Sequence, residues 1–471
     1  MSRRKHRVHV SRSCQAPVVV DYSACSPPPP LGWIPRSQNT GRLMSAAEQI
    51  TEWPDLAALS PLRDAPSLSG LRVCIVGINF PPEVTGIAPY TSALANAALG
   101  AGAEVRVITG VPHYPEWRVD RDYRVGLRWR EEVEGVTVTR RRHFVPASPG
   151  LVGRAAMEAS FMAHAVPSIL RDKADVIVAI TPSSAALAAA VAAKRGRPLG
   201  VIVQDLTGNA AVQSGSAGAR LGGAIASAEY ALMRRADLVG VIAPQFGRVL
   251  TEHGIKADRL RDVPNFTHID DTDISKEEAR RKLGWPQDRY LVVHSGNIGM
   301  KQGLDMVVDA ARLAEQQGSD VEFVIVGDGN QRARLMDEAR GLRNIRFVGL
   351  LNERKYLMAL AAADQLLLCE KPGVQEMSLP SKLTSYVSAR RPIIASVDPN
   401  GITHQYLVHN SLAWVVPGNR SSDLVHHVGC LRSDAPARSM IVASARAAAT
   451  AGLAADGARE RYARFVVDLL S

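Results

Sequence analysis

The chain is poor in cysteine and in aromatic residues, and it contains no long apolar run. Its five cysteines among 471 residues are scattered, without the short spacings that bind a metal ion. Cys74 and Cys369 lie inside apolar stretches typical of a buried core, which fits a reducing, cytoplasmic location. Because no stretch of about 18 uncharged apolar residues is present, the sequence predicts no membrane-spanning helix.

Several motifs of nucleotide and metal chemistry are also absent. The chain has no Gly-x-x-x-x-Gly-Lys-Ser/Thr phosphate loop, no His-Glu-x-x-His helix and no Cys-x-x-Cys pair. Its glycine turns do not match the full dinucleotide fingerprint, so hydride transfer is a poor interpretation. We predict neither a bound metal nor a cofactor.

The positive charge is concentrated near the start of the sequence. Residues 1–43 contain seven basic residues and one acid, Asp21, together with four consecutive prolines from Pro27. Such a segment cannot bury enough apolar surface to fold, so we predict a disordered basic extension over residues 1–70. Residues 1–43 account for six of the ten units of net positive charge. The mildly basic remainder argues against nucleic-acid binding but leaves weak attraction to an anionic membrane surface open.

From residue 71 onward, short apolar runs alternate with helical patterns. This rhythm predicts parallel sheets with right-handed crossovers, and it breaks near Pro264, before a charged helix over residues 276–283. We therefore predict two doubly wound, Rossmann-like α/β domains, residues 71–267 and 268–454, with a last helix within 455–471 that packs back onto the first. The predicted strands are 72–76, 104–108, 136–140, 175–179, 199–203 and 238–241, then 291–294, 322–326, 345–347, 365–369, 393–396 and 413–415.

Two glycine turns stand out, each between a predicted strand and a predicted helix. The first follows the opening strand of the first domain and contains Gly86 and Ile87; the second follows the opening strand of the second domain and contains Gly296, Asn297 and Gly299. Glycine lets backbone N–H groups approach an anion closely, and a helix start attracts negative charge. Two such turns on facing domains predict a cleft for a phosphorylated ligand, and nucleotide-sugar chemistry above all.

Two lysines lie beside predicted anion sites. Lys301 comes two residues after Gly299, where its ammonium would stabilise charge on a departing diphosphate. The alternative is a solvated lysine at a helix start. Lys382 follows Pro380 and Ser381 at the start of another helix, with an ordinary surface lysine as the alternative.

Further polar candidates lie where strands end. Gly327 ends a strand of the second domain, at the edge where open α/β sheets bind ligands. Asp205 follows strand 199–203 and either faces the cleft or caps a turn. Glu376 lies in the loop before Lys382, where it would meet sugar hydroxyls. The candidate acceptor-side residues are Asn79, Glu83, Thr85 and His113. As alternatives, Asn79 could equally bond its own backbone, and a lone histidine such as His113 is more often structural.

The order and spacing of these motifs resemble the retaining glycosyltransferases of the two-domain GT-B type (glycosyltransferase group 1, family 4), in particular the exopolysaccharide transferases of the colanic-acid type. The resemblance covers nearly everything from residue 71 onward. The matching motifs are Gly77-Ile78-Asn79-Phe80-Pro81-Pro82-Glu83-Val84-Thr85-Gly86-Ile87, Pro112-His113-Tyr114-Pro115, Gln204-Asp205-Leu206, Pro264-Asn265-Phe266, Ser295-Gly296-Asn297-Ile298-Gly299 with Lys301-Gln302-Gly303-Leu304, and Pro380-Ser381-Lys382-Leu383.

The resemblance implies an enzyme that moves a sugar from a nucleoside diphosphate sugar to a saccharide acceptor that is lipid-linked. It places the nucleotide sugar, a co-substrate, in the second domain and the acceptor in the first. Lys301 and Lys382 would then meet the donor, Gly86 and Ile87 would offer backbone N–H groups, and Asn297 stands where many relatives carry a second cation. The expected place of action is the cytoplasm, with peripheral contact at the inner membrane face.

One departure from the family pattern keeps alternatives open. Many relatives carry two glutamates eight residues apart, where this chain has Met377 and Ser385; Glu376 is the candidate substitute. A GT-B module that binds without catalysis, or a GT-B epimerase or phosphorylase, are the alternative functions. Segment 152–170 is apolar enough to lie at a membrane interface, and a buried helix explains it as well.

Overall fold

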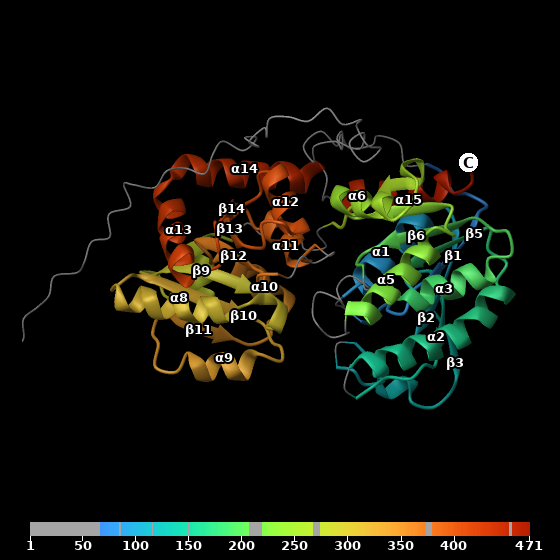
Figure 1. Ribbon diagram of the computed structural model, residues 1–471, viewed down its shortest axis with the longest axis horizontal. Helices are drawn as coiled ribbons and strands as arrows, with labels where there is room; N and C mark the ends of the chain where they lie inside the picture. The colour runs from blue at the N-terminus through green and yellow to red at the C-terminus, as the bar shows by residue number, and fades with distance from the viewer. Residues whose placement is uncertain are drawn as a thin grey trace, which may run out of the picture.

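The structure is a computed structural model that describes residues 66–471 except 84–85, 115, 148–149, 207–218, 267–273, 374–378 and 452–454. Most of the predicted extension, and two candidate site residues, Thr85 and Glu376, lie outside the described residues. Figure 1 shows two lobes, one coloured blue to green and the other yellow to red, and each is built around one sheet.

The first sheet has eight strands within the described residues, in the order β3-β4-β2-β1-β5-β6-β7-β8. In β5 the side chains of Ile177 and Ala179 enter one core cluster, and those of Val176 and Val178 enter another. A parallel strand covered on both faces has an unbroken apolar run, which is why the sequence shows these strands clearly. The strands are β1 (Arg72–Val76), β2 (Glu104–Gly110), β3 (Arg128–Val133), β4 (Val136–Arg141), β5 (Val176–Ile180), β6 (Leu199–Val203), β7 (Leu238–Val241) and β8 (Leu260–Asp262).

Strand β3 was not among the predicted strands. It lies at the edge of the first sheet and pairs antiparallel with β4, whereas the other described strand pairs of this sheet are parallel. Its sequence, Arg-Trp-Arg-Glu-Glu-Val, is half exposed and mostly charged. An edge strand of this kind carries no apolar run, so it resembles a loop in the sequence.

The second sheet has six described strands, all parallel, in the order β11-β10-β9-β12-β13-β14. Its predicted strands are confirmed within one residue at each end. The order reverses at β9, whose neighbours β10 and β12 lead to opposite edges, and open α/β sheets bind ligands at such a switch point. The strands are β9 (Tyr290–Ser295), β10 (Val321–Val326), β11 (Ile345–Val348), β12 (Gln365–Cys369), β13 (Ile393–Ser396) and β14 (Trp414–Val415).

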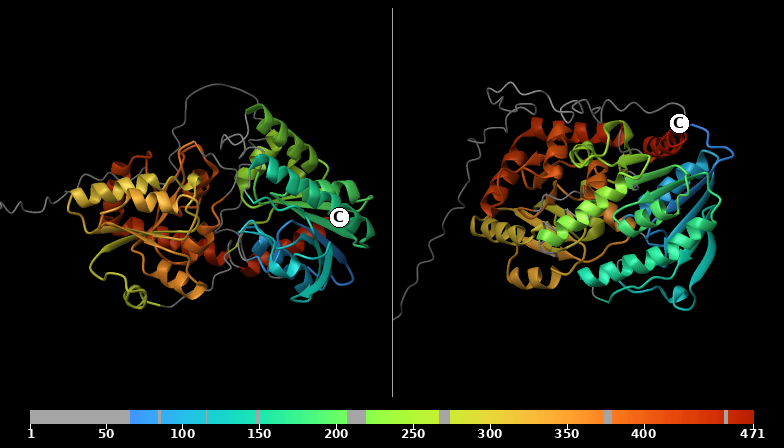
Figure 2. Two further views of the ribbon diagram at one scale, coloured as in Figure 1. Left: turned by 90° about the horizontal axis from the view of Figure 1, so that it is seen from below. Right: turned by 45° about the vertical axis from the view of Figure 1, so that its right-hand side comes forward.

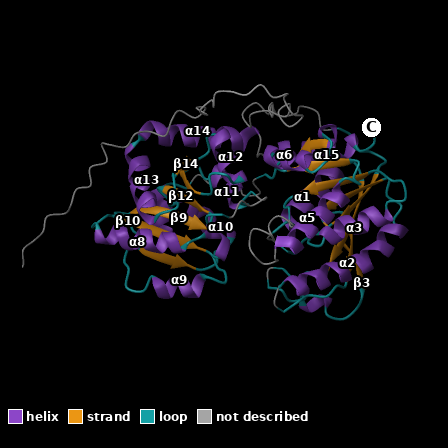
Figure 3. Ribbon diagram, viewed as in Figure 1, coloured by secondary structure: helices purple, strands orange, loops and turns teal. Residues whose placement is uncertain are grey.

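Helices cover both faces of each sheet (Figure 3). Those of the first lobe are α1 (Ala88–Gly100), α2 (Leu151–Arg171), α3 (Ser184–Ala193), α5 (Ala219–Met233) and α6 (Pro244–Glu252). Those that follow are α7 (Lys276–Leu283), α8 (Asp305–Gln316), α9 (Arg332–Glu338), α10 (Glu353–Ala361), α11 (Lys382–Ser388), α12 (Ile402–His409), α13 (Ser421–Ser433), α14 (Ala435–Ala451) and α15 (Ala455–Asp468). Among the described residues, no helix combines the length and apolar character that crossing a bilayer requires.

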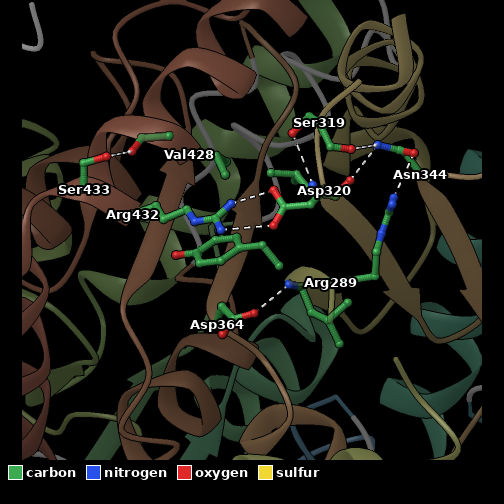
Figure 4. Close-up of polar contacts among 12 residues, drawn as sticks. Arg289, Ser319, Asp320, Asn344, Asp364, Val428, Arg432 and Ser433 are labelled. Carbon is green, nitrogen blue, oxygen red and sulfur yellow. Dashed lines mark hydrogen bonds and ion pairs between the residues drawn. The ribbon is translucent and has the colours of Figure 1, made fainter. Parts of the chain in front are cut away.

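Ion pairs and hydrogen bonds occupy the amino-terminal edge of the second sheet. Arg289, Asp320, Asn344 and Asp364 each directly precede a strand. Arg432 of α13 donates to both carboxylate oxygens of Asp320, at 2.6 and 3.0 Å, and Arg289 donates to Asn344 at 2.9 Å (Figure 4). Asp364 accepts a backbone N–H of β9 at 2.7 Å. The polar groups at the amino edge thus bond to one another. The residues predicted to bind a ligand lie at the opposite, carboxyl edge of the sheet.

The last helix, α15, returns to the first lobe and contacts α1. Figures 1 and 2 show it in red among blue and green elements. Phe465 is 1% exposed and lies flat on the sheet: a Cβ added at Gly200 of β6 would be 2.7 Å from its ring, and one at Gly240 of β7 would be 3.3 Å away. Glycine at these two strand positions makes room for the ring.

We predict that Phe465→Ala destabilises the first lobe by about 3–5 kcal/mol, because it leaves a cavity against two strands. Urea unfolding followed by circular dichroism should show an earlier transition for the variant. Leu470→Ala, at a side chain that is 45% exposed two residues after α15, is the matched control and should unfold like the unmodified protein. Equal transitions for both variants would contradict the assigned packing.

Candidate active site

The candidate site begins with two glycine turns in contact at the carboxyl edge of the second sheet. Gly296 follows β9 with φ +116°, and Gly327 follows β10 with φ +136°. A Cβ at Gly327 would lie 1.9 Å from the carbonyl oxygen of Gly296, so any other residue would force the two strands apart. Ile298 N–H donates to the carbonyl of Asp328 at 2.8 Å and ties the turns together. Gly296 and Asn297 are exposed, while Gly299 is buried.

Lys382 extends from α11 to the underside of this turn. A Cβ at Gly296 would lie 3.4 Å from Lys382 Cε and 3.6 Å from its Nζ, which is van der Waals contact, so the end of the lysine lies directly against the turn. The ammonium Nζ is 3.2 Å from Nε2 of His294, the penultimate residue of β9. Burial lowers the pKa of Lys382 to about 8, although the nearby Cys369 and Glu370 act in the opposite direction. The ammonium therefore lies in the protein beside the exposed turn, and the side chain as a whole is half-buried.

Lys301 is placed differently. It lies in a single 3-10 turn, Met300–Gln302, and α8 begins only at Asp305, so it does not start the long helix. Its side chain is exposed, and its carbonyl accepts the N–H of Lys371 at 2.7 Å. Lys301 and Lys382 thus lie on segments that flank the same glycine turn, one exposed and one enclosed.

The first lobe contributes a second turn, at the start of α1. Gly86 is exposed with φ +66°, and Ile87 is the N-cap residue of α1. Glu83 is buried before this turn: its carboxylate accepts the N–H groups of His113 and Tyr114, both at 2.8 Å, and the side-chain amide of Asn79 at 2.9 Å. These bonds hold the loop after β1 against the loop after β2. They give Glu83 and Asn79 a structural role, and contact with an acceptor stays a prediction.

His113 is buried in the loop after β2. Its Nδ1 lies 3.0 Å from the carbonyl of Val111, so that nitrogen carries the hydrogen. The ring is packed edge to face against His143, with centroids 4.8 Å apart, and lies 6.1 Å from Trp117. The neighbouring ring system makes His113 part of a packed cluster rather than an isolated histidine.

Side chains of α1 and α11 approach each other across the two lobes. Tyr90, in the first turn of α1, lies close enough to Thr384 of α11 for the Thr384 side chain to affect the pKa of Tyr90. Burial raises the pKa of Tyr90 to about 12, and the charge of Asp205, two residues after β6, acts in the same direction. Ser381, which is exposed, precedes α11 and accepts the hydroxyl of Thr384 at 2.8 Å through its carbonyl. The starts of α1 and α11 therefore lie near each other, with Asp205 beside them.

Two features of this region were not among the sequence candidates. His294 is one, because a single histidine in an apolar strand is typical of a core residue. The other is a pocket of about 540 Å³ beside His113, formed by the loops after β2 and β4 and the middle of α2. Its walls come from segments far apart in the sequence, and no short motif marks it. The lining residues are Trp117, Arg118, Val119, Arg142, His143, Phe144, Val145, Ala147, Ser160 and His164.

Within the described ranges, no group of three or more His, Cys, Asp or Glu side chains is arranged to hold a metal ion. The Gly296 turn lies instead beside the ammonium of Lys382 and close in sequence to the exposed Lys301, and cations of this kind bind anions.

The chain matches family models over most of its described length. Residues 85–265 match the glycosyl transferase 4-like domain, and residues 275–448 match the glycosyl transferases group 1 model. It is 32% identical over 336 residues to WcaI of Escherichia coli, which is named as a colanic acid biosynthesis glycosyl transferase, covering 68% of this chain and 81% of the relative. The chain belongs to the group 1 glycosyltransferases.

Other comparisons agree with this family. The glycosyltransferase is 31% identical over 144 residues to a GDP-mannose-dependent phosphatidylinositol dimannoside mannosyltransferase of Mycobacterium tuberculosis, covering 27% of the chain and 37% of that protein. Sucrose-phosphate synthase of Thermosynechococcus elongatus superposes with a TM-score of 0.67 at 16% identity, over 85% of this chain and 99% of that one. HepE of Anabaena in complex with UDP superposes with a TM-score of 0.61 at 15% identity, over 84% and 100%. The expected GT-B fold is confirmed.

We predict that Lys382 makes anion binding by this glycosyltransferase dependent on pH. Because burial lowers its pKa to about 8, the side chain is charged below that pH and neutral above it. We predict that the affinity for the nucleoside diphosphate that binds best among UDP, GDP and ADP falls about tenfold between pH 7.5 and 9.5, as one charged hydrogen bond is lost. The diphosphate itself stays fully ionised there, since its last pKa is about 6.

Isothermal titration calorimetry at several pH values measures this loss. The control is Lys382→Met, which should bind weakly with little change over the same range. Parallel curves for the variant and the unmodified protein would assign the pH dependence to another group.

Proposed function

We propose that the protein transfers a sugar from a nucleoside diphosphate sugar to a hydroxyl of a saccharide acceptor with retention of anomeric configuration. The observation that carries the proposal is the enclosed ammonium of Lys382 beside the exposed Gly296 turn, across from the start of α1. A diphosphate between these groups would meet the amino-terminal end of α1 from the first lobe and positive charge from the second.

In the proposed reaction, the bond between the anomeric carbon and the departing phosphate oxygen breaks while the acceptor oxygen bonds to the same carbon on the same face. The acceptor proton moves to the departing phosphate oxygen. Lys301 and Lys382 stabilise the charge that develops on the diphosphate, and preorganised electrostatic stabilisation of this kind supplies much of the rate enhancement of many enzymes. This assignment needs no carboxylate nucleophile; a double-displacement route would need one close to the sugar. Asp205 lies at the edge of the site and is a candidate for orienting the acceptor.

The donor sits against the second lobe in this proposal, and the acceptor against the first. The pocket beside His113 has room for a saccharide unit, and its Trp117 and Phe144 offer apolar surface of the kind that sugar rings contact. The names of the relatives, a colanic acid transferase and a phosphatidylinositol mannoside transferase, support a saccharide or glycolipid acceptor in polysaccharide or glycolipid synthesis. A lipid-linked acceptor in the cytoplasm at the inner membrane face is consistent with both.

Lys301→Ala should lower turnover at least about 100-fold, the scale for removing one preorganised donor of charge. The assay measures release of nucleoside diphosphate from UDP-, GDP- and ADP-sugars with and without saccharide acceptors, in the presence of EDTA. EDTA is included because the proposal assigns charge compensation to lysines rather than to a metal.

Lys173→Ala is the control: this exposed lysine lies between α2 and β5, at the opposite edge of the first sheet. Near-normal turnover of the Lys301 variant would sink its assigned role. Turnover of a sugar nucleotide without any acceptor would favour an epimerase or phosphorylase instead.

We also propose peripheral contact with an anionic membrane surface. The apolar stripe of α2, Met157, Phe161 and two later residues, is buried in the first lobe, which favours the buried-helix interpretation of this segment. Exposed apolar side chains lie nearby instead: Val152 in the first turn of α2 is 83% exposed and Leu127, before β3, is 68% exposed. Leu127 is tied to the loop after β4, because its carbonyl accepts the N–H of Arg142 at 3.1 Å.

The paired substitution Leu127→Ser and Val152→Ser should reduce co-sedimentation with vesicles that contain anionic lipid by at least about fivefold, because apolar insertion and charge attraction act together. Met336→Ser, at a 42% exposed site on α9 of the other lobe, is the control and should sediment like the unmodified protein. Absence of binding by the unmodified protein at low salt would end the proposal of membrane contact.

A further inference from the structure

His294 is a buried imidazole next to the candidate site with both ring nitrogens in contact. It is 1% exposed. Its Nδ1 is 3.2 Å from the carbonyl oxygen of Leu367 in β12, and its Nε2 is 3.2 Å from Nζ of Lys382. A carbonyl oxygen can only accept a hydrogen bond, so Nδ1 carries the hydrogen, and Nε2 then offers a lone pair. An ammonium can only donate, which completes a directed chain from Lys382 through His294 to Leu367.

The environment keeps His294 neutral. Burial, followed by the adjacent Lys382 charge, lowers the pKa of His294 well below its ordinary value, and the hydrogen bond to Leu367 acts only partly against this. A protonated imidazole would place two cations 3.2 Å apart and would have no lone pair for the ammonium. The ring therefore remains an acceptor over the working pH range.

The contact fixes one of three hydrogens on the Lys382 ammonium. The ammonium is also next to Gly296, where a Cβ would lie 3.6 Å from Nζ. The other charged or titratable groups that face it are the thiol of Cys369, whose own pKa is raised by burial, and Glu370, which accepts the hydroxyl of Thr403 at 2.8 Å. The side chain seen at hydrogen-bond distance from Nζ is His294, so it is the residue placed to direct the ammonium.

We propose that His294 is a positioning residue: through Nε2 it holds the Lys382 ammonium beneath the Gly296 turn, so that its remaining N–H groups face the diphosphate of the donor. The role rests on the proposed sugar transfer. This positioning role requires a hydrogen-bond acceptor at the place of the His294 Nε2 atom. A side chain that only fills the same volume would not perform it.

The neighbouring contact provides a matched structural control. Tyr386 lies one helical turn after Lys382, and its hydroxyl accepts the N–H of Ser295 at 2.8 Å and donates to Leu367 at 3.2 Å. It joins α11 to β9 and β12 as His294 does, but its described hydrogen bonds do not include the ammonium. Tyr386→Phe therefore loosens the same helix without removing the acceptor of Lys382.

The experiment compares kcat/KM against pH for the unmodified protein, His294→Met, His294→Gln and Tyr386→Phe. His294→Met should lower kcat/KM about tenfold, as expected for losing one hydrogen bond to a charged group. It should also shift the decrease of kcat/KM at high pH by about one unit to lower pH, because an ammonium without an acceptor loses its proton at lower pH. His294→Gln, whose amide oxygen reaches the position of Nε2, should restore most of the activity. Tyr386→Phe should lower thermal stability and leave the pH of the fall in place.

Two comparisons separate the outcomes. In the Lys382→Met background, His294→Met should have no further effect, because His294 acts through Lys382; additive losses would overturn the proposal. An unshifted pH profile for His294→Met would overturn the proposal as well.

If His294→Met does not fold, His294→Asn replaces it, because its shorter amide cannot reach the ammonium. Equal pH profiles for the Asn and Gln variants would contradict the positioning role of His294. An unmodified protein that turns over no sugar nucleotide would refute the proposed reaction itself, and the pH dependence of diphosphate binding would then test His294 alone.

Discussion

The contact between Gly296 and Gly327 is the constraint on which the rest of the candidate site depends. The carbonyl of one turn lies where a Cβ of the other would be, so β9 and β10 end in direct backbone contact. On its other side the Gly296 turn lies against Lys382. A side chain at Gly327 would collide with that carbonyl, and one at Gly296 would be strained at φ +116°, so either would move the turn that lies beside the Lys382 ammonium. The geometry of the site therefore depends on glycine at both positions as well as on Lys382.

Charged groups stand at both edges of the second sheet. At the amino edge, Asp320 and Asp364 are paired with arginine and backbone groups, so their negative charge is compensated locally. At the carboxyl edge stand Lys301 and Lys382, with Glu370 held by Thr403 and the exposed Asp328 in the turn after β10. Binding of an anion at this edge would therefore depend on where the two ammonium groups lie and not on a uniformly positive field.

The sequence predicts well the bounds of strands that consist of continuous apolar runs. Buried parallel strands such as β1 and β12 have the predicted bounds, because both of their faces require apolar residues. Strand β3 escapes prediction because an exposed edge strand needs no such run. Lys301 and Lys382 are marked by nearby glycine and proline, whereas nothing in the sequence marks His294. Its significance comes from α11, which is distant in sequence and brings an ammonium to its ring.

The two lysines differ in a way that suits a reaction with a departing group. Lys382 is enclosed and has its direction set before any ligand binds, so little reorganisation accompanies its interaction with a diphosphate. Lys301 is exposed on a short turn, where a ligand can reach it. Asn297, on the Gly296 turn, stands where the family resemblance places a second cation and carries no charge. In the proposed reaction the enclosed ammonium of Lys382 supplies the charge that Asn297 lacks. To keep that charge, the residue that holds the ammonium must be a neutral hydrogen-bond acceptor, as His294 is. A carboxylate in its place would cancel the positive charge that the diphosphate requires.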